Sequence, residues 1–443
     1  VKLNIQEIAK SVEGTFLSTA AGDEILHLSI DSRSSKYGAN ELFIALKGPN
    51  HNAHLFISEL IDKGIKNFLV EEHHKEVEGI SIIQVPSTLT ALHKLSTDKR
   101  EGFAGIVIGI TGSNGKTIVK EWLSDLLSVQ YNVLKSPKSY NSQVGVPLSV
   151  WPLKPENDIA IFEAGISQPE EMDNLAKIIR PNIGIFTNIG TAHDEFFDSR
   201  QQKIAEKLKL FTKSDSLIFC SDNAELTSQV GTTFGGEKIT WSLHKEALYT
   251  VRLIQDGQLS IEKGSHKYVF DVHVKDQASL ENIIHCIVTC LHLGLNQSQI
   301  QLGIGVIRPI KMRLELKKGI NRTYLIDDTY NNDVAGLQRA LDFMDQQKHV
   351  SSKTVILSDF VQNKFTDDFF KELNTLLVQK SVSRLVAIGP HLTNHKSAFT
   401  IPASFYQNTD EFLRSAEIRK FNNELILIKG ARQFQLERVS KVL

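Results

Sequence analysis

The sequence predicts an α/β protein of three domains: a mixed α/β N-terminal domain (1–100), a central parallel-sheet P-loop domain (101–310) and a C-terminal Rossmann-like α/β domain (311–443). Three observations carry this prediction. The 443 residues exceed what one hydrophobic core holds. Two separate series of apolar strands alternate with helices, which is typical of parallel sheets. A more mixed pattern of short strands and helices precedes both series.

The overall composition narrows the classes of partner and compartment. Hydrophobic residues at 41% and charged residues at 23% are ordinary for a globular protein in water. A formal net charge of -1 provides no field that attracts nucleic acid or an anionic membrane, so we expect neither partner. No apolar run approaches the roughly 20 residues of a membrane span, and no signal-peptide pattern opens the chain. We therefore expect a cytoplasmic protein without membrane insertion.

The cysteines predict no disulfide framework, because the chain has only 3 of them. Cys286 and Cys290 lie one helical turn apart and would suit half of a metal site. No second pair completes such a site. We therefore predict two packed core thiols.

The N-terminal hundred residues contain short strands, at 68–72 and 80–85, between helical segments. The charge run at 71–76 is interpreted as a solvated face. This part of the chain predicts a small mixed domain that ends near residue 100.

The central domain begins where the apolar strands lengthen and alternate with helices. Near-continuous apolar runs predict parallel strands that are buried on both faces. These strands are expected at 105–110, 158–165, 182–190 and 215–222. A long apolar helix at 279–295 follows, and the proline-containing segment 305–319 predicts a domain junction.

The C-terminal domain repeats the alternation of strands and helices. Its strands are expected at 323–331, 353–360, 384–390 and 423–432, with helices at 367–379 and 410–418.

Residues 105–123, GIVIGITGSNGKTIVKEWL, combine a buried strand, a loop of small residues and a helix. The helix has an apolar face made of Val119, Trp122, Leu123, Leu126 and Leu127. In this arrangement, free backbone N–H groups and the helix dipole bind phosphate. The alternative is a glycine turn before a surface helix, and the flanking strand and amphipathic helix favour phosphate.

The loop supplies the residue types that nucleotide binding needs. Glycines permit close backbone approach, Lys116 neutralises phosphate oxygens and the Thr117 hydroxyl can ligate Mg²⁺. The candidate contacts with ATP are Thr111, Gly112, Ser113, Asn114, Gly115, Lys116 and Thr117. The usual nucleotide signature places glycine where this chain has Ile110.

Three further polar residues have unremarkable interpretations when each is taken alone. Glu163 closes a strand, at the carboxyl end where α/β sheets place their ligands, and a glutamate there also simply faces water. His193 alone suits a structural hydrogen bond. Lys207 alone suits a surface position, because Ile204, Leu208 and Phe211 form the apolar face of its helix.

Taken together, the order and spacing of these residues resemble the Mur ligase family, ATP-dependent amide ligases that build the peptidoglycan peptide. The family's phosphate loop normally lacks the glycine that Ile110 replaces. The resemblance implies two Mg²⁺ ions, the second held by Glu163 and His193. It also implies a carbamate on Lys207, which stands fourteen residues after His193. Lys116, Glu163, His193 and Lys207 are thereby the expected catalytic residues.

The resemblance extends over nearly the whole chain. It implies that the N-terminal domain binds the UDP end of the substrate, and that the C-terminal domain closes over ATP and binds the incoming dipeptide. The implied substrate-binding residues are Ser32, Arg33, His54 and Asn141. The implied further contacts with ATP are Asn282, Arg313 and Asp328.

Within the family, the segments around Asp328 and Lys429 are most similar to the member that joins D-alanyl-D-alanine to UDP-MurNAc-tripeptide. Some segments also resemble a form of it that is fused ahead of an alanine racemase, and a chain cut from such a fusion is a hypothesis. The interpretations left open are the ligase that adds the third amino acid, a folylpolyglutamate synthase, a non-catalytic nucleotide-gated switch and a plain phosphotransferase. A folylpolyglutamate synthase starts near the phosphate loop, so the N-terminal hundred residues argue against it. A switch needs no second metal, so the set Glu163, His193 and Lys207 argues against that class.

Overall fold

The computed structural model gives an α/β protein, as the sequence predicts. It describes residues 3–20, 24–33, 35, 38–48, 51–190, 196–255, 257–272, 274, 276–308, 314–347, 352–360 and 365–443. The chain divides into two compact units. One comprises 1–187, 204–272 and 283–305, and the other comprises 188–203, 273–282 and 306–443.

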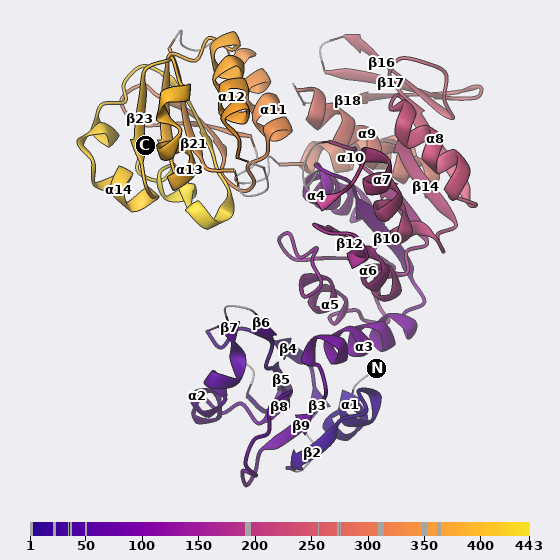
Figure 1. The fold of residues 1–443 in the computed structure, drawn as a ribbon. Helices are drawn as coiled ribbons and strands as arrows, with labels where there is room; N and C mark the ends of the chain where they lie inside the picture. Colours follow the sequence, from indigo (N-terminus) through magenta and orange to yellow (C-terminus); the bar gives the residue numbers. More distant parts are fainter. Residues whose placement is uncertain are drawn as a thin grey trace. The chain divides into compact units, whose positions relative to one another are not determined.

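The N-terminal part of the first unit is built on a five-stranded sheet of order β2-β9-β8-β5-β4 (Figure 1). Its strands are β2 (Thr15–Ser18), β4 (His27–Ser29), β5 (Glu41–Ile44), β8 (Asn67–Val70) and β9 (Ser81–Gln84). All neighbours pair in parallel except β2 with β9. Two short antiparallel pairs join β1 (Leu3–Asn4) with β3 (Glu24–Ile25), and β6 (Lys47–Gly48) with β7 (His51–Asn52). The two strands expected from the sequence are therefore present as β8 and β9.

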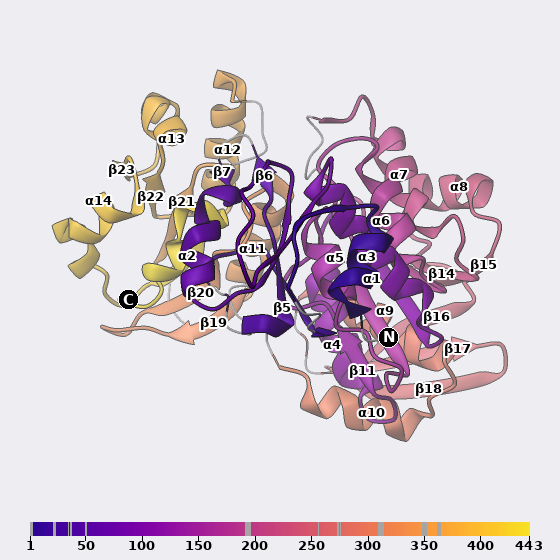
Figure 2. The ribbon, with the colours of Figure 1, turned by 90° about the horizontal axis from the view of Figure 1, so that it is seen from below.

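Helices of this region are α1 (Ile5–Ser11), α2 (Ile57–Asp62) and α3 (Thr88–Glu101). Helix α1 lies beside α3 (Figure 2), where the Ser11 hydroxyl donates to Asp98 at 2.6 Å. Trp151, from the segment after α5 (Gly145–Val150), packs into the apolar core of this sheet, and its indole N–H donates to Leu26 O at 3.0 Å. The α3 helix also packs on α5 and on α6 (Glu171–Ile179). This packing joins the N-terminal sheet to the central one.

The central sheet has nine strands in the order β11-β12-β10-β13-β14-β15-β16-β17-β18. Its strands are β10 (Ile106–Thr111), β11 (Val133–Lys135), β12 (Ile159–Glu163), β13 (Ile183–Phe186), β14 (Ser216–Cys220), β15 (Glu237–Ser242), β16 (Tyr249–Gln255), β17 (Gln258–Lys263) and β18 (His266–Asp271). Strands β12 and β13 are buried at every residue, as the apolar runs predict for strands covered on both faces.

One part of this sheet differs from the expected all-parallel arrangement. The strands from β11 to β16 are parallel, but β16, β17 and β18 form an antiparallel meander. Their turns contain Gly257 and Gly264, both with positive φ, as short hairpin connections require. The glycines in the sequence were the available signal for these hairpins.

The remaining helices around the central sheet include the long apolar helix expected at 279–295. They are α4 (Lys116–Leu127), α7 (Arg200–Leu208), α8 (Ala224–Thr233), α9 (Gln277–His292) and α10 (Gln297–Val306). Cys286 and Cys290 of α9 are fully buried, and burial raises the pKa of both thiols. The prediction of packed core thiols is confirmed. No helix in the described ranges is long and apolar enough to cross a bilayer.

The second unit contains a six-stranded sheet of order β19-β20-β24-β21-β22-β23, parallel except for the edge strand β19. Its strands are β19 (Glu315–Lys318), β20 (Tyr324–Asp328), β21 (Lys353–Ser358), β22 (Arg384–Ile388), β23 (Ala403–Tyr406) and β24 (Leu425–Lys429). Its helices are α11 (Val334–Asp345), α12 (Asp367–Gln379), α13 (Pro390–Asn394) and α14 (Thr409–Arg414). The Asp333 side chain caps α11 by accepting the Gly336 N–H at 2.8 Å.

A buried histidine links the central sheet to α9. His285 is fully buried, its Nδ1 accepts the Trp241 indole N–H at 3.1 Å, and its Nε2 lies 2.9 Å from Thr187 O. With Nδ1 as acceptor, Nε2 carries the proton and donates to Thr187. Burial lowers the pKa of His285 from 6.5 to about 4, so the ring is neutral in the folded protein at neutral pH.

This histidine predicts a loss of stability in mild acid. In the unfolded chain His285 binds a proton with a pKa of 6.5, and in the folded chain its pKa is about 4. The contribution of the neutral ring to stability is therefore full above pH 6.5 and is lost as the pH falls toward 4. By about pH 5 the free energy of unfolding is expected to lose about 2 kcal/mol through this group. In His285→Gln, the difference in unfolding free energy between about pH 7.5 and about pH 5, measured by tryptophan fluorescence in urea, should shrink by that amount. The exposed His266→Gln is the control, and an equal pH dependence in both variants would contradict the prediction.

Candidate active site

The phosphate loop connects β10 to α4 through two glycines with unusual backbone conformations. Gly112 has φ 143° and Gly115 has φ 84°, and side chains rarely tolerate either value. The N-cap of α4 is Gly115, a residue with no side chain that could cap the helix. A glycine loop that leads directly into a helix N-terminus is the arrangement in which backbone N–H groups bind phosphate, and we therefore expect an anion at this loop.

The Lys116 side chain folds back over this loop. Its Nζ donates to Gly112 O at 2.8 Å and to Ser113 O at 3.3 Å. Directly after the neighbouring strand β13, Thr187 donates its N–H to Thr111 O at 2.9 Å and its hydroxyl to Asn114 O at 2.5 Å. The loop is thus held in shape by its own lysine and by the next strand of the sheet.

Three oxygen-bearing side chains meet beside this loop. The Thr117 hydroxyl donates to Glu163 Oε2 at 2.9 Å, and its oxygen lies 2.9 Å from the Ser139 hydroxyl. Glu163 ends β12, is fully buried, and pairs in register with Ile110 of β10. Two hydroxyls and a carboxylate are hard oxygen donors, and this set fits Mg²⁺.

Sequence reasoning missed Ser139. It stands two residues before Asn141, in the segment that resembles the acceptor-side motif of the family. A hydroxyl residue so close to a motif asparagine was the available signal, but nothing local indicates that it reaches Thr117.

Lys207 lies on α7 and is 1% exposed. Helical periodicity alone places it at the surface, and that interpretation is wrong. Its Nζ lies 3.5 Å from Gly112 O, so this lysine reaches the phosphate loop. His193 lies outside the described residues.

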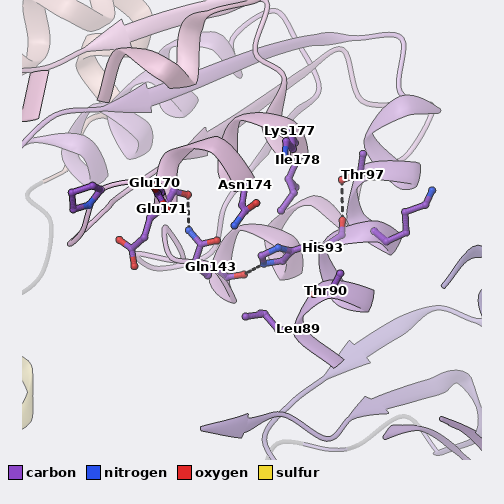
Figure 3. Close-up of a pocket in the computed structure, with 12 residues that line it drawn as sticks. Leu89, Thr90, His93, Thr97, Gln143, Glu170, Glu171, Asn174, Lys177 and Ile178 are labelled. Atoms are coloured by element: carbon purple, nitrogen blue, oxygen red, sulfur yellow. Dashed lines mark hydrogen bonds between the residues drawn. The ribbon is translucent and has the colours of Figure 1, made fainter. Parts of the chain in front are cut away.

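The segment that carries Asn141 is anchored on several sides. Asn141 O accepts the Gly165 N–H at 2.8 Å, just beyond the end of β12. Gln143 Nε2 donates to Glu171 O at 2.8 Å, and Gln143 O lies 2.6 Å from His93 Nε2 (Figure 3). Burial lowers the pKa of His93, so the neutral ring donates its Nε2–H. Contacts with α3 and α6 thus anchor this segment. His93, Gln143 and Glu171 are among the residues that line a groove of 510 Å³ there.

The expected substrate-binding residues of the N-terminal region lie after β4 and β7. Arg33 is exposed and pairs with Asp31 at 2.8 Å, which lowers the pKa of that carboxyl to about 2. His54 is buried: its Nε2 accepts the Glu71 N–H at 2.9 Å, and its Nδ1 lies 2.7 Å from Asn52 Oδ1. Both ring nitrogens of His54 are therefore engaged with the protein. Ser32 is half-buried in the turn before Arg33.

In the second unit, the expected ATP contact Asp328 ends β20. Its Oδ2 accepts from Lys429 Nζ at 2.7 Å, and the same ammonium donates to Asn331 O at 2.6 Å. Lys429 is buried, so its charge depends on these partners. Asn282 of α9 is also buried. Arg313 lies outside the described residues.

Comparison with known proteins assigns the class that the P-loop, the parallel sheet and the oxygen cluster indicate. The Mur ligase middle domain matches residues 110–290. The UDP-N-acetylmuramoyl-tripeptide–D-alanyl-D-alanine ligase of Synechocystis sp. is 30% identical over 361 residues, which cover 77% of this chain and 75% of that protein. The ligase of the same name from Bacillus subtilis is 26% identical over all of this chain and 98% of its own length.

Solved structures show the same fold. MurF from Acinetobacter baumannii superposes with a TM-score of 0.84 over all of this chain and 99% of that one, at 22% identity. The MurF ligase of Thermotoga maritima in complex with ADP gives 0.77 over 94% of this chain and 96% of that one, at 21% identity. The chain belongs to the Mur ligase family. Its relatives of similar length carry the name of the D-alanyl-D-alanine-adding ligase.

The loop geometry predicts that Lys116 contributes directly to nucleotide binding. Replacing it with methionine removes charge-assisted contacts to phosphate, which are worth about 1.5–3 kcal/mol. Lys116→Met should weaken ADP binding at least about 10-fold in titration calorimetry, without unfolding the protein. Lys154→Met, at an exposed lysine that lies 3.7 Å from Glu156, is the control and should bind ADP as the wild type does. Equal affinities in the two variants would contradict the assignment of the loop.

Proposed function

We propose that this protein is an ATP-dependent ligase that joins D-alanyl-D-alanine to UDP-MurNAc-tripeptide in peptidoglycan precursor synthesis, with release of ADP and phosphate. The relatives that span the chain have this activity in their names. The observation that carries the proposal is the meeting of Thr117, Ser139 and Glu163 beside the phosphate loop. A simple phosphate-binding turn needs no buried carboxylate there.

The phosphate loop binds ATP in this proposal. Its backbone N–H groups bind the phosphates, and Lys116 leaves Gly112 O and Ser113 O to neutralise the γ-phosphate oxygens. The remaining proposed contacts with ATP are Asn282, Arg313 and Asp328.

Two magnesium ions complete the proposed site. Thr117, Ser139 and Glu163 would hold one ion, and Glu163 with His193 would hold the second, assisted by a carbamate on Lys207. Bound magnesium offsets the repulsion between the substrate carboxylate and ATP and stabilises charge on the transferred phosphoryl group.

The chemistry takes place in two steps. A carboxylate oxygen of the tripeptide attacks the γ-phosphorus, the bond to ADP breaks, and an acyl phosphate forms. The amine of D-alanyl-D-alanine then attacks the acyl carbon, loses a proton, and phosphate leaves. Positioning and charge neutralisation supply most of the rate increase in such transfers. Lys116 contributes charge in the first step, and Asn141 positions the acceptor side of the substrate.

The other proposed assignments concern the ends of the chain. Ser32, Arg33 and His54 bind the UDP part of the precursor, and residues 311–443 bind the dipeptide. ATP and a UDP-linked precursor as substrates favour a cytoplasmic location. A fused alanine racemase stays a hypothesis.

The proposed activity predicts a strict substrate requirement. Phosphate release from ATP should need both UDP-MurNAc-tripeptide and D-alanyl-D-alanine, because the acyl phosphate turns over only when an amine receives the acyl group. The measurement is phosphate release with each substrate omitted in turn. Release without the dipeptide would contradict the assignment. Release with UDP-MurNAc-dipeptide and a free amino acid instead would favour the ligase that adds the third residue.

The carbamate predicts chemical rescue. Lys207→Ala should lower phosphate release about 100-fold, because a metal-organising carboxylate would be lost, and added formate or acetate should restore part of the rate. Lys209→Ala is the matched control. That lysine lies two residues further along and pairs at the surface with Asp173 and Glu206, so its rate should stay near wild type. Full activity of Lys207→Ala without rescue would exclude the carbamate.

A further inference from the structure

Lys120 has no place in the mechanism above, yet it is buried beside the site. It lies on α4, one turn after Lys116 and three residues after Thr117, and its side chain is 0% exposed. Ammonium groups are almost never fully buried unless they are paired, because water no longer solvates the charge. The contacts of the Lys120 ammonium therefore indicate its role.

The Lys120 ammonium has three protons, and three acceptors surround it. Nζ donates to Ser136 O at 2.8 Å and to Lys138 O, and it lies 3.0 Å from Glu121 Oε1. Glu163 Oε1 stands 3.8 Å away, beyond hydrogen-bond length. Two of the three acceptors are thus backbone carbonyls of one short segment.

That segment carries the hydroxyl that completes the oxygen cluster. Ser139 follows Lys138 directly, and its Oγ lies 2.9 Å from Thr117 Oγ1. Lys138 has φ 51°, a left-handed conformation that costs a non-glycine residue free energy and needs contacts to maintain it. The bond from Lys120 to the Lys138 carbonyl is such a contact.

We propose that Lys120 is a positioning residue, whose ammonium fixes Ser136 and Lys138 so that the Ser139 hydroxyl meets Thr117 and Glu163 at the cation site. This inference rests on the proposed function only for the identity of the cation, Mg²⁺. Protein acceptors engage the three protons of the Lys120 ammonium, so Lys120 acts through Ser139 and not by contact with nucleotide or substrate. Its charge also attracts Glu163 without occupying that carboxylate in a hydrogen bond.

The test measures the binding of a non-hydrolysable ATP analogue by calorimetry, with and without Mg²⁺, in the full chain. Lys120→Met should lower the gain in affinity that Mg²⁺ provides by about 10-fold and leave binding without Mg²⁺ within about 2-fold. Ser139→Ala should show a similar loss. Because Lys120 acts through Ser139, the double variant should lose little more than either single variant.

Lys135→Met is the matched control. Lys135 pairs with the same Glu121, at 2.6 Å, and its ion-pair partners among the described residues are Glu121 and Asp125, not the carbonyls of Ser136 and Lys138. Its Mg²⁺-dependent gain should therefore equal that of the wild type. An unchanged gain in Lys120→Met, or additive losses in the double variant, would overturn the proposal. If Lys120→Met does not fold, Lys120→Gln takes its place in the same cycle, with an expected loss of about 3-fold, and an unchanged gain again overturns it.

The same experiment separates this inference from the proposed function. A wild-type protein that binds the analogue with Mg²⁺ but does not release phosphate with both substrates contradicts the ligase assignment alone. The binding cycle of Lys120 and Ser139 still decides the positioning role in that case.

Discussion

The Thr117 hydroxyl makes the contact on which the rest of the site depends. It has one proton, which goes to the carboxylate of Glu163, so the Ser139 hydroxyl donates to it in turn. This one oxygen joins the start of α4, the end of β12 and the segment before Asn141. A divalent cation at this point would have oxygen ligands from these three parts of the chain.

Buried lysine side chains maintain the backbone around that contact. Lys120 and Lys207 come from helices α4 and α7, and both donate to backbone carbonyls of loops at the carboxyl ends of the central strands. Bonds to backbone carbonyls fix the conformation of these loops, and they do not use the Glu163 carboxylate as an acceptor. Glu163 Oε1 lies 3.8 Å from the Lys120 ammonium, beyond hydrogen-bond length, and we expect its carboxylate to be a cation ligand.

Much of the fold and part of the site could be predicted from the sequence. The strand, glycine loop and amphipathic helix around Lys116 are local, and the apolar face from Val119 to Leu127 is buried as its periodicity indicates. The Glu163 position also follows from its place at a strand end. The antiparallel hairpins of β16, β17 and β18 were not predicted, although Gly257 and Gly264 were available as turn signals.

The sequence by itself determined many of the strands and helices and predicted which loop binds phosphate, because those properties depend on periodicity and on glycines within about 20 residues. Only the tertiary structure decided that Lys207 and Lys120 are buried and that Ser139 reaches Thr117. The physical reason is the strand order of the sheet. Pairing β12 beside β10 brings Glu163 next to the phosphate loop, and no spacing along the chain specifies which strands become neighbours.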